Sequence, residues 1–187
     1  MTISIKPTAS GSTIEQDGST ILTVDGSGNI SIANDLSVTG NVPANTGPAF
    51  FVRKSTNQTI TSGVETKITF DTETFDTASC FNNTGSTVGG IPSYSFLPNV
   101  AGYYQLNFTL MCENSISLTR YIIVVQKNGT FLEALEDGGT INKTTASYLV
   151  YLNGTTDYVS YSTYIFATTP IVSSGNTVFS GFLARSA

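Results

Sequence analysis

Two groups of acidic residues are the first candidates for chemistry in this sequence. One lies in the stretch FDTETFD, which places carboxylates at Asp71, Glu73 and Asp76. Closely spaced oxygen ligands suit Ca²⁺, so these three residues are candidate calcium ligands. Acidic residues between strands are more often solvated turn residues, and we favour that interpretation. The sequence therefore predicts no cofactor, with calcium as the alternative that stays open.

The second acidic group lies in FLEALEDGG and consists of Glu133, Glu136 and Asp137. Paired carboxylates catalyse glycoside hydrolysis, but nothing in this pattern fixes the pair on facing elements. The chain has no histidine, which excludes Ser–His and Cys–His nucleophile pairs and imidazole metal ligands. It also has neither a phosphate-binding glycine-rich loop with lysine nor a Gly-x-Ser-x-Gly motif. We therefore expect a binding or structural protein and not an enzyme.

The two cysteines, Cys80 and Cys112, are expected to be buried free thiols. Two cysteines this far apart give no disulfide framework, and Cys112 falls on the apolar face of a predicted strand. Their redox state is not fixed by the sequence, so a disulfide between them stays open as an alternative.

Composition favours one all-β domain with an appendage. The chain has 187 residues, of which 11% are charged, and its net charge is −5. Ser, Thr, Asn and Gly carry most of the polarity and favour strands and turns. The eight lysines and arginines are scattered, which argues against nucleic-acid binding. The start of the sequence resembles no secretory signal, and no stretch is apolar for long enough to span a bilayer.

Residues 1–48 differ from the rest and form a predicted N-terminal anchor or stalk. Short apolar runs alternate with Asp17-Gly18 and Asp25-Gly26, which are strong turn signals. A segment this short, with few large apolar side chains, cannot fold alone. We therefore expect it to pack against copies of itself or against another protein. A disordered tail is the alternative. The boundary is placed at the proline-bearing stretch GNVPANTGP.

The stretch FLPNVAGYYQLNFTLM contains the most regular strand. From Gly102 onward the even positions are apolar and the odd ones include Gln105, Asn107 and Thr109. This period of two predicts a half-buried strand whose even residues face a core. The predicted core positions are Tyr104, Leu106, Phe108, Leu110 and Cys112.

Two further strands, in RYIIVVQKNG and ASYLVYLNG, are apolar on both faces. In a two-layer sandwich only one face of a strand meets the intrachain core, so the second apolar face needs another partner. A second subunit is the simplest partner, and coverage by the chain's own loops is the alternative. The candidate subunit-interface residues are Tyr121, Ile123, Val125, Leu149 and Tyr151.

The stretch FLPNVAGYYQLNF resembles the signature of the C1q-like globular head. The matching positions are Phe96, Gly102, Tyr104, Leu106 and Phe108, where Leu106 replaces the phenylalanine of the pattern. The order of the surrounding strands agrees over residues 49–187. The loop ASCFNNTGSTVGGIPSY departs from the family because it is longer and richer in glycine.

The resemblance implies a jelly-roll sandwich of about ten strands, of the kind shared with tumour necrosis factor, assembled as a homotrimer. The stretch DGSGNISIANDLSVTGNVPA resembles N-terminal segments of bacteriophage fibre and virion proteins. Together these features predict a phage virion protein, synthesised in the host cytoplasm and carried on the particle surface. Its head is expected to bind a host-surface glycan or protein, while residues 1–48 contact other virion proteins of the capsid or tail. A free C1q-like ligand-binding module away from any virion is the alternative.

Overall fold

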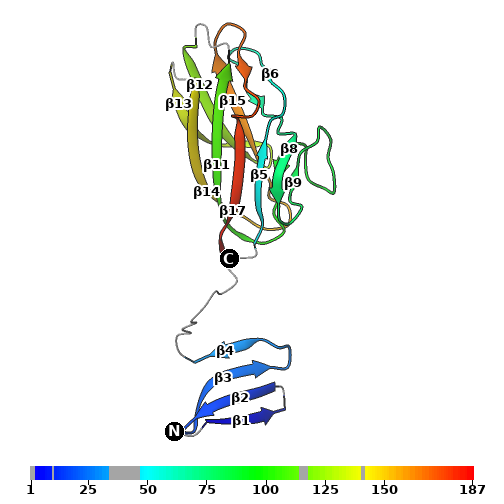
Figure 1. Cartoon of the computed structure of the whole chain (residues 1–187), viewed down its shortest axis with the longest axis vertical. Coiled ribbons are helices and arrows are strands. Elements are labelled where there is room, and N and C mark those ends of the chain that lie inside the picture. The colour runs from blue at the N-terminus through cyan, green and yellow to red at the C-terminus, as the bar shows by residue number, and fades with distance from the viewer. Residues whose placement is uncertain (1–2, 10, 34–46, 114–117, 140–141) are drawn as a thin grey trace. The chain divides into compact units, whose positions relative to one another are not determined.

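The computed structural model describes residues 3–9, 11–33, 47–113, 118–139 and 142–187. Within these residues every regular element is a β-strand, and the strands pair antiparallel, which confirms the all-β prediction. The chain divides into two compact units, Met1–Ala44 and Asn45–Ala187 (Figure 1). The boundary expected after residue 48 falls just inside the second unit. No helix in the described ranges is long and apolar enough to cross a membrane.

The N-terminal unit is a four-stranded antiparallel sheet in sequence order. Its strands are β1 (Ile3–Thr8), β2 (Gly11–Gln16), β3 (Ser19–Asp25) and β4 (Ile30–Ile32). Asp17 and Gly18 both have positive φ and form the tight turn between β2 and β3 that the sequence predicts. In the next turn the Asp25 carboxylate accepts hydrogen bonds from the backbone amides of Ser27 and Asn29.

The second unit, called the head below, contains two antiparallel sheets that enclose one core. The first sheet runs in the order β6 (Gln58–Thr59), β16 (Ile171–Val172), β11 (Gly102–Glu113), β17 (Val178–Ser186), β5 (Ala49–Arg53) and β8 (Thr72–Asp76), and β14 (Lys143–Leu152) also pairs with β11. The second sheet runs in the order β13 (Thr130–Gly138), β12 (Arg120–Lys127), β15 (Val159–Phe166), β10 (Ser95–Phe96) and β9 (Phe81–Asn82), and β7 (Thr66–Lys67) pairs with β15. Figure 1 shows the long strands of the two sheets as the two layers of a sandwich.

Strand β11 has the alternation that the sequence predicts. All five predicted core positions are at most 3% exposed, whereas the odd positions are only partly covered or exposed. Phe108 stacks on Phe179 of β17 at a centroid distance of 4.7 Å, and Phe179 meets Phe50 of β5 edge-on at 4.8 Å. Phe108 also meets Tyr161 of β15, in the second sheet, edge-on at 5.0 Å, so aromatic rings from both sheets fill the space between the layers.

The residues of the family signature lie in or against this core. Phe96 stacks on Phe50 at 4.4 Å, and the Tyr104 hydroxyl donates to the Val100 carbonyl at 2.7 Å. A Cβ at Gly102 would lie 2.4 Å from the Arg185 carbonyl oxygen, so the close approach of β17 requires glycine there. The signature therefore specifies packing in this chain and contributes no exposed chemical group.

Replacement of the two neighbouring residues Phe108 and Asn107 by alanine tests the register of β11. Phe108→Ala removes a ring that is 1% exposed and should lower the free energy of unfolding by about 3 to 5 kcal/mol. Asn107→Ala, on the opposite face, should cost about 1 kcal/mol or less. Urea denaturation of both variants measures the difference, and equal losses would contradict the register.

Candidate functional site

An apolar patch lies on the outward face of the first sheet, away from the core. We define it by Tyr103 of β11, Leu149 and Tyr151 of β14, and Phe182 of β17. Tyr103 pairs with Tyr151 across β11 and β14, and Gln105 pairs with both Leu149 and Phe182. Paired residues of neighbouring strands share a face, so these side chains form one contiguous surface.

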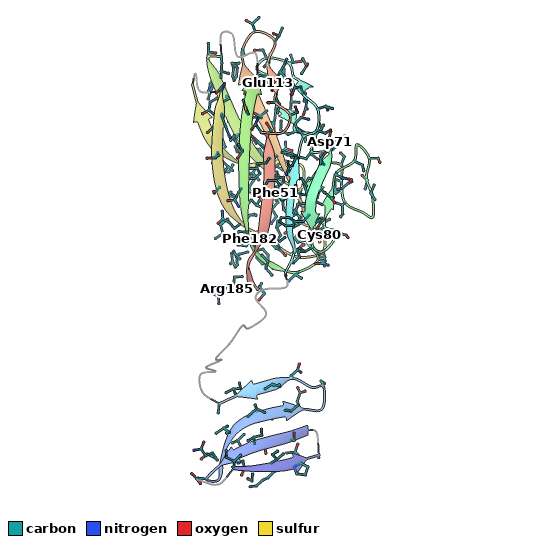
Figure 2. All side chains as sticks on the ribbon, in the orientation of Figure 1. Phe51, Asp71, Cys80, Glu113, Phe182 and Arg185 are labelled. Atoms are coloured by element: carbon teal, nitrogen blue, oxygen red, sulfur yellow. The ribbon has the colours of Figure 1, made fainter. Side chains whose placement is uncertain are left out.

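The four side chains of the apolar patch are between 42% and 55% exposed. The rings of Tyr103 and Tyr151 meet edge-on with centroids 5.5 Å apart, and the Lys127 ammonium lies 6.0 Å from the centre of the Tyr151 ring. Further along the same face, Phe51 of β5 lies beside Phe75 of β8 at 6.4 Å. Figure 2 labels Phe182 and Phe51 on the neighbouring strands β17 and β5. A contiguous patch of this kind marks an interaction surface more often than isolated apolar residues do.

The structure corrects the predicted interface for the strand over 121–125. Tyr121, Ile123 and Val125 lie in the core of the chain itself and are at most 3% exposed, so no second subunit reaches them. The chain also covers part of the other face of this sheet. The Glu65 carboxylate accepts hydrogen bonds from Gln126 at 2.7 Å, and from Ser162 and Tyr164 on the adjacent β15.

Of the predicted interface residues, Leu149 and Tyr151 therefore remain available, and Tyr103 and Phe182 join them. Sequence reasoning missed Tyr103 because the next three odd positions of its strand, Gln105, Asn107 and Thr109, are polar. Phe182 follows Gly181, whose Cβ would lie 2.8 Å from Leu106, so Gly181 faces the core and Phe182 faces outward. Alternation within VFSGFLAR is the signal that places Phe182 on the outer face.

The predicted calcium ligands do not converge on an ion site. Asp71 accepts hydrogen bonds from the backbone amide and hydroxyl of Ser55, and Asp76 accepts from the amides of Ala78 and Phe81. Burial alone would raise the pKa of Asp71, but the hydrogen bonds from Ser55 and Thr72 and the charge of Lys54 lower it. Burial and the nearby Asp76 raise the pKa of Glu73. Among the described residues no three acidic, cysteine or histidine side chains are placed to hold a metal.

The second acidic group supplies no carboxylate pair in the described part of the chain. Glu133 is exposed on β13, and the side chains of Glu136 and Asp137 lie outside the described residues. Cys80 and Cys112 are buried free thiols, as expected. Burial raises the pKa of the Cys112 thiol to about 11, so this group is a poor nucleophile near neutral pH.

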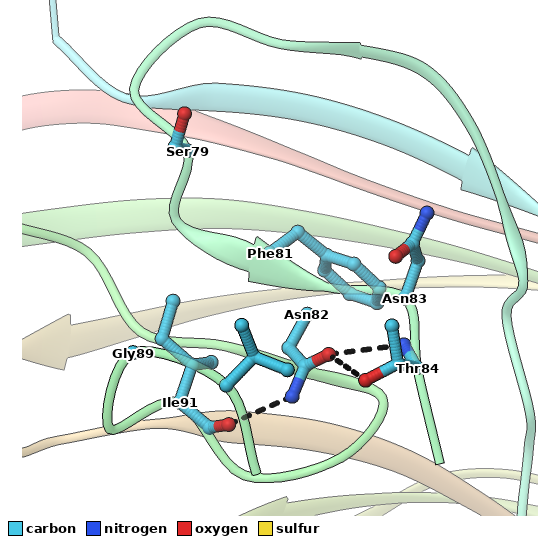
Figure 3. Close-up of a pocket in the computed structure, with 8 residues that line it drawn as sticks. Ser79, Phe81, Asn82, Asn83, Thr84, Gly89 and Ile91 are labelled. Atoms are coloured by element: carbon cyan, nitrogen blue, oxygen red, sulfur yellow. Dashed lines mark hydrogen bonds between the residues drawn. The ribbon is translucent and has the colours of Figure 1, made fainter. Parts of the chain in front are cut away.

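A pocket of about 260 Å³ lies beside β9, in the glycine-rich loop that departs from the family pattern (Figure 3). Its lining combines Phe81, Val88 and Ile91 with Ser79, Asn83 and Thr84, and it contains no charged residue. Such a lining suits a small neutral ligand with both apolar and hydroxyl-rich surface.

Asn82 fixes the loop that forms this pocket. Its side-chain amide donates to the carbonyls of Ser86 and Ile91, and its oxygen accepts from the amide and hydroxyl of Thr84. Figure 3 shows the bonds to Thr84 and Ile91. The Lys67 ammonium group also holds the end of this loop, because it donates hydrogen bonds to the Ser93 carbonyl and the Ser95 hydroxyl. Burial lowers the pKa of this ammonium group.

Comparison with known proteins identifies the fold. No family model and no curated protein sequence matches the chain. Among solved structures, murine APRIL at pH 5.0 has a TM-score of 0.53 and 10% identity, covering 73% of this chain and 98% of that one. PRD1 vertex protein P5 has a TM-score of 0.50 and 16% identity, covering 76% and 100%. The globular domain of zebrafish complement 1qA has a TM-score of 0.48 and 18% identity, covering 75% and 99%. The head therefore has a jelly-roll fold like those of murine APRIL and PRD1 vertex protein P5, which confirms the predicted jelly roll.

Replacement of Asn82 tests how the pocket loop is held. Asn82→Ala removes the four hydrogen bonds that the side chain of this 4% exposed residue makes to Thr84, Ser86 and Ile91, so it should cost about 1 to 3 kcal/mol. Hydrogen exchange at residues 84–91 should accelerate in this variant. Asn83→Ala, at the adjacent pocket residue, is the control and should leave exchange in the loop unchanged. Unaltered exchange in Asn82→Ala would contradict the role assigned to its side chain.

Proposed function

We propose that this protein is a phage virion protein that acts by binding, as a homotrimeric spike whose jelly-roll head projects from the particle. The observation that carries the proposal is the apolar patch of Tyr103, Leu149, Tyr151 and Phe182, which the chain itself leaves exposed. Three copies packed around an axis would remove these side chains from water. The proposal includes attachment of the N-terminal unit to capsid or tail proteins and of the head to a host-surface glycan or protein.

The sequence, the comparisons and the titratable groups also support the proposal. The signature resemblance carries the expectation of a trimer, and the N-terminal stretch resembles phage fibre and virion segments. A vertex protein is among the solved structures that share the fold. The described titratable groups form no catalytic site that would favour an enzyme. We therefore propose a protein that acts by binding alone, without a catalytic residue or a cofactor.

A second candidate is a free ligand-binding module that is not part of a virion. The uncharged pocket between Ser79 and Ile91 favours it, because a small neutral ligand such as a sugar fits the chemistry of the lining. The two candidates differ in location. A virion component is found at constant copy number on purified particles, whereas a free module is found in the soluble fraction.

The trimer is tested by the mass of the head in solution. Sedimentation of residues 45–187 should give about three times the mass of one chain at micromolar concentration. Leu149→Asp places a charge in the patch at a residue that is 55% exposed in the single chain, so it should dissociate the trimer without unfolding the head. Phe131→Asp is the matched control, because Phe131 is 57% exposed but lies on the other sheet, and its mass should stay threefold.

Incorporation into particles tests the virion proposal. Particles lacking the native protein should take up the full chain, whereas residues 45–187 alone should stay trimeric and unincorporated. Electron microscopy of the particles measures the occupancy. Normal occupancy by the truncated head would move the attachment site out of the N-terminal unit, and absence of the full chain from particles would favour the free module.

A further inference from the structure

One face of the N-terminal sheet carries a row of aliphatic side chains, and Ser12 and Gln16 are polar residues on the same face. Cross-strand pairing aligns Ile5, Ile14, Leu22 and Ile32 in one row through all four strands. Residues two positions away on a strand share its face, so further aliphatic side chains flank this row. These flanking side chains are Ile3, Val24 and Ile30.

The opposite face of the same sheet is polar. The adjacent cross-strand row consists of Lys6, Thr13, Thr23 and Ser31, one residue further along each strand or one before it. Lys6 also forms an ion pair with Glu15 on this side. Charged side chains of the described strand pairs thus lie on one face, and the aliphatic row has none.

The aliphatic face is uncovered within the N-terminal unit. Ile5 is 71% exposed, Ile30 is 63% exposed and Ile3 is 57% exposed. A sheet that is apolar on one face is stable only when a second layer buries that face. The described residues of the unit Met1–Ala44 form one layer, so a second layer has to come from outside these residues.

We infer that the second layer is the same aliphatic face of the other two copies in the trimer, so that three N-terminal sheets pack with their aliphatic faces inward. This inference rests on the trimer proposed for the head. It assigns the aliphatic row to self-association and leaves the polar faces and the free edges of β1 and β4 for particle proteins.

The size of the face favours a tethered copy over a free partner. Four strands about 4.8 Å apart and about six residues long give a face of roughly 300 to 400 Å². A stable complex between free proteins buries about 800 Å² on each partner, so this face is too small to hold a free partner well. Copies joined through a trimeric head meet at an effective concentration that is about millimolar for short connections, which compensates for a small interface.

The charge distribution also favours copies of this chain. Symmetric packing brings identical side chains close to one axis, where like charges would repel. The aliphatic face avoids that repulsion because its row is uncharged, whereas packing through the polar face would bring Lys6 and Glu15 of each copy near their equivalents. The same uncharged surface offers little by which a different protein could be selected.

Disulfide trapping in the full chain tests this inference. The single variants Ile14→Cys and Leu22→Cys each place one thiol per chain in a central strand of the aliphatic row. The single variants Thr13→Cys and Thr23→Cys each place one thiol on the polar face, one residue away. Under mild oxidation the first pair should give a covalent dimer on a non-reducing gel about tenfold faster than the second pair, at a rate independent of protein concentration. The unsubstituted chain, with Cys80 and Cys112 buried, gives the background.

The outcomes separate this inference from the proposed function. Equal, slow cross-linking of both pairs while the head sediments at threefold mass would overturn the inference and retain the trimer. If cross-linking is equal and slow, and the thiols at positions 14 and 22 become protected from maleimide only on assembled particles, the aliphatic face binds a particle protein instead. A head that sediments as a monomer refutes the proposed trimer, and with it this arrangement of the N-terminal sheets.

Discussion

Alternation along β11 is the constraint on which the rest of the head depends. Each even side chain points between the sheets and each odd one points away, so a single strand determines both the core and the outer surface. The inward side is closed by aromatic rings around Phe179. The outward side carries Tyr103 and lies beside Tyr151 and Phe182, and the chain does not bury these rings. One face of this sheet therefore belongs to the core, and the other face carries the exposed apolar patch.

Both units leave apolar side chains exposed, but among the described residues only the head has a core of its own. The head has a two-layer core of its own, and the apolar patch on its first sheet stays exposed. The described residues of the N-terminal unit form one layer, and we infer that association covers its aliphatic face. If the head trimerises, it supplies the local concentration that the weaker N-terminal interface requires. Association of the heads and packing of the N-terminal sheets are then coupled steps.

Much of the fold could be predicted from the sequence, because its signals are local. The period of two over residues 102–112 gave the correct buried face, and Asp17-Gly18 gave a correct turn. The interface was only partly predictable. Apolar residues on both faces of the 121–125 strand suggested a second subunit, but Glu65, about sixty residues earlier, lies over that outer face. Phe182 joins the patch through pairing across β11, and such a register between distant strands is not visible in one sequence. The pocket depends on how Asn82 folds a long loop, which composition alone does not specify.

We propose that the outward face of the first sheet is the subunit interface of the head. A cryo-electron microscopy map of the purified full-length protein tests it most directly. The map should show three heads around one axis, with β11, β14 and β17 innermost and the rings of Tyr103, Tyr151 and Phe182 buried between copies. A monomeric head, or an assembly joined through β12 and β13 of the second sheet with the apolar patch still in water, would contradict it.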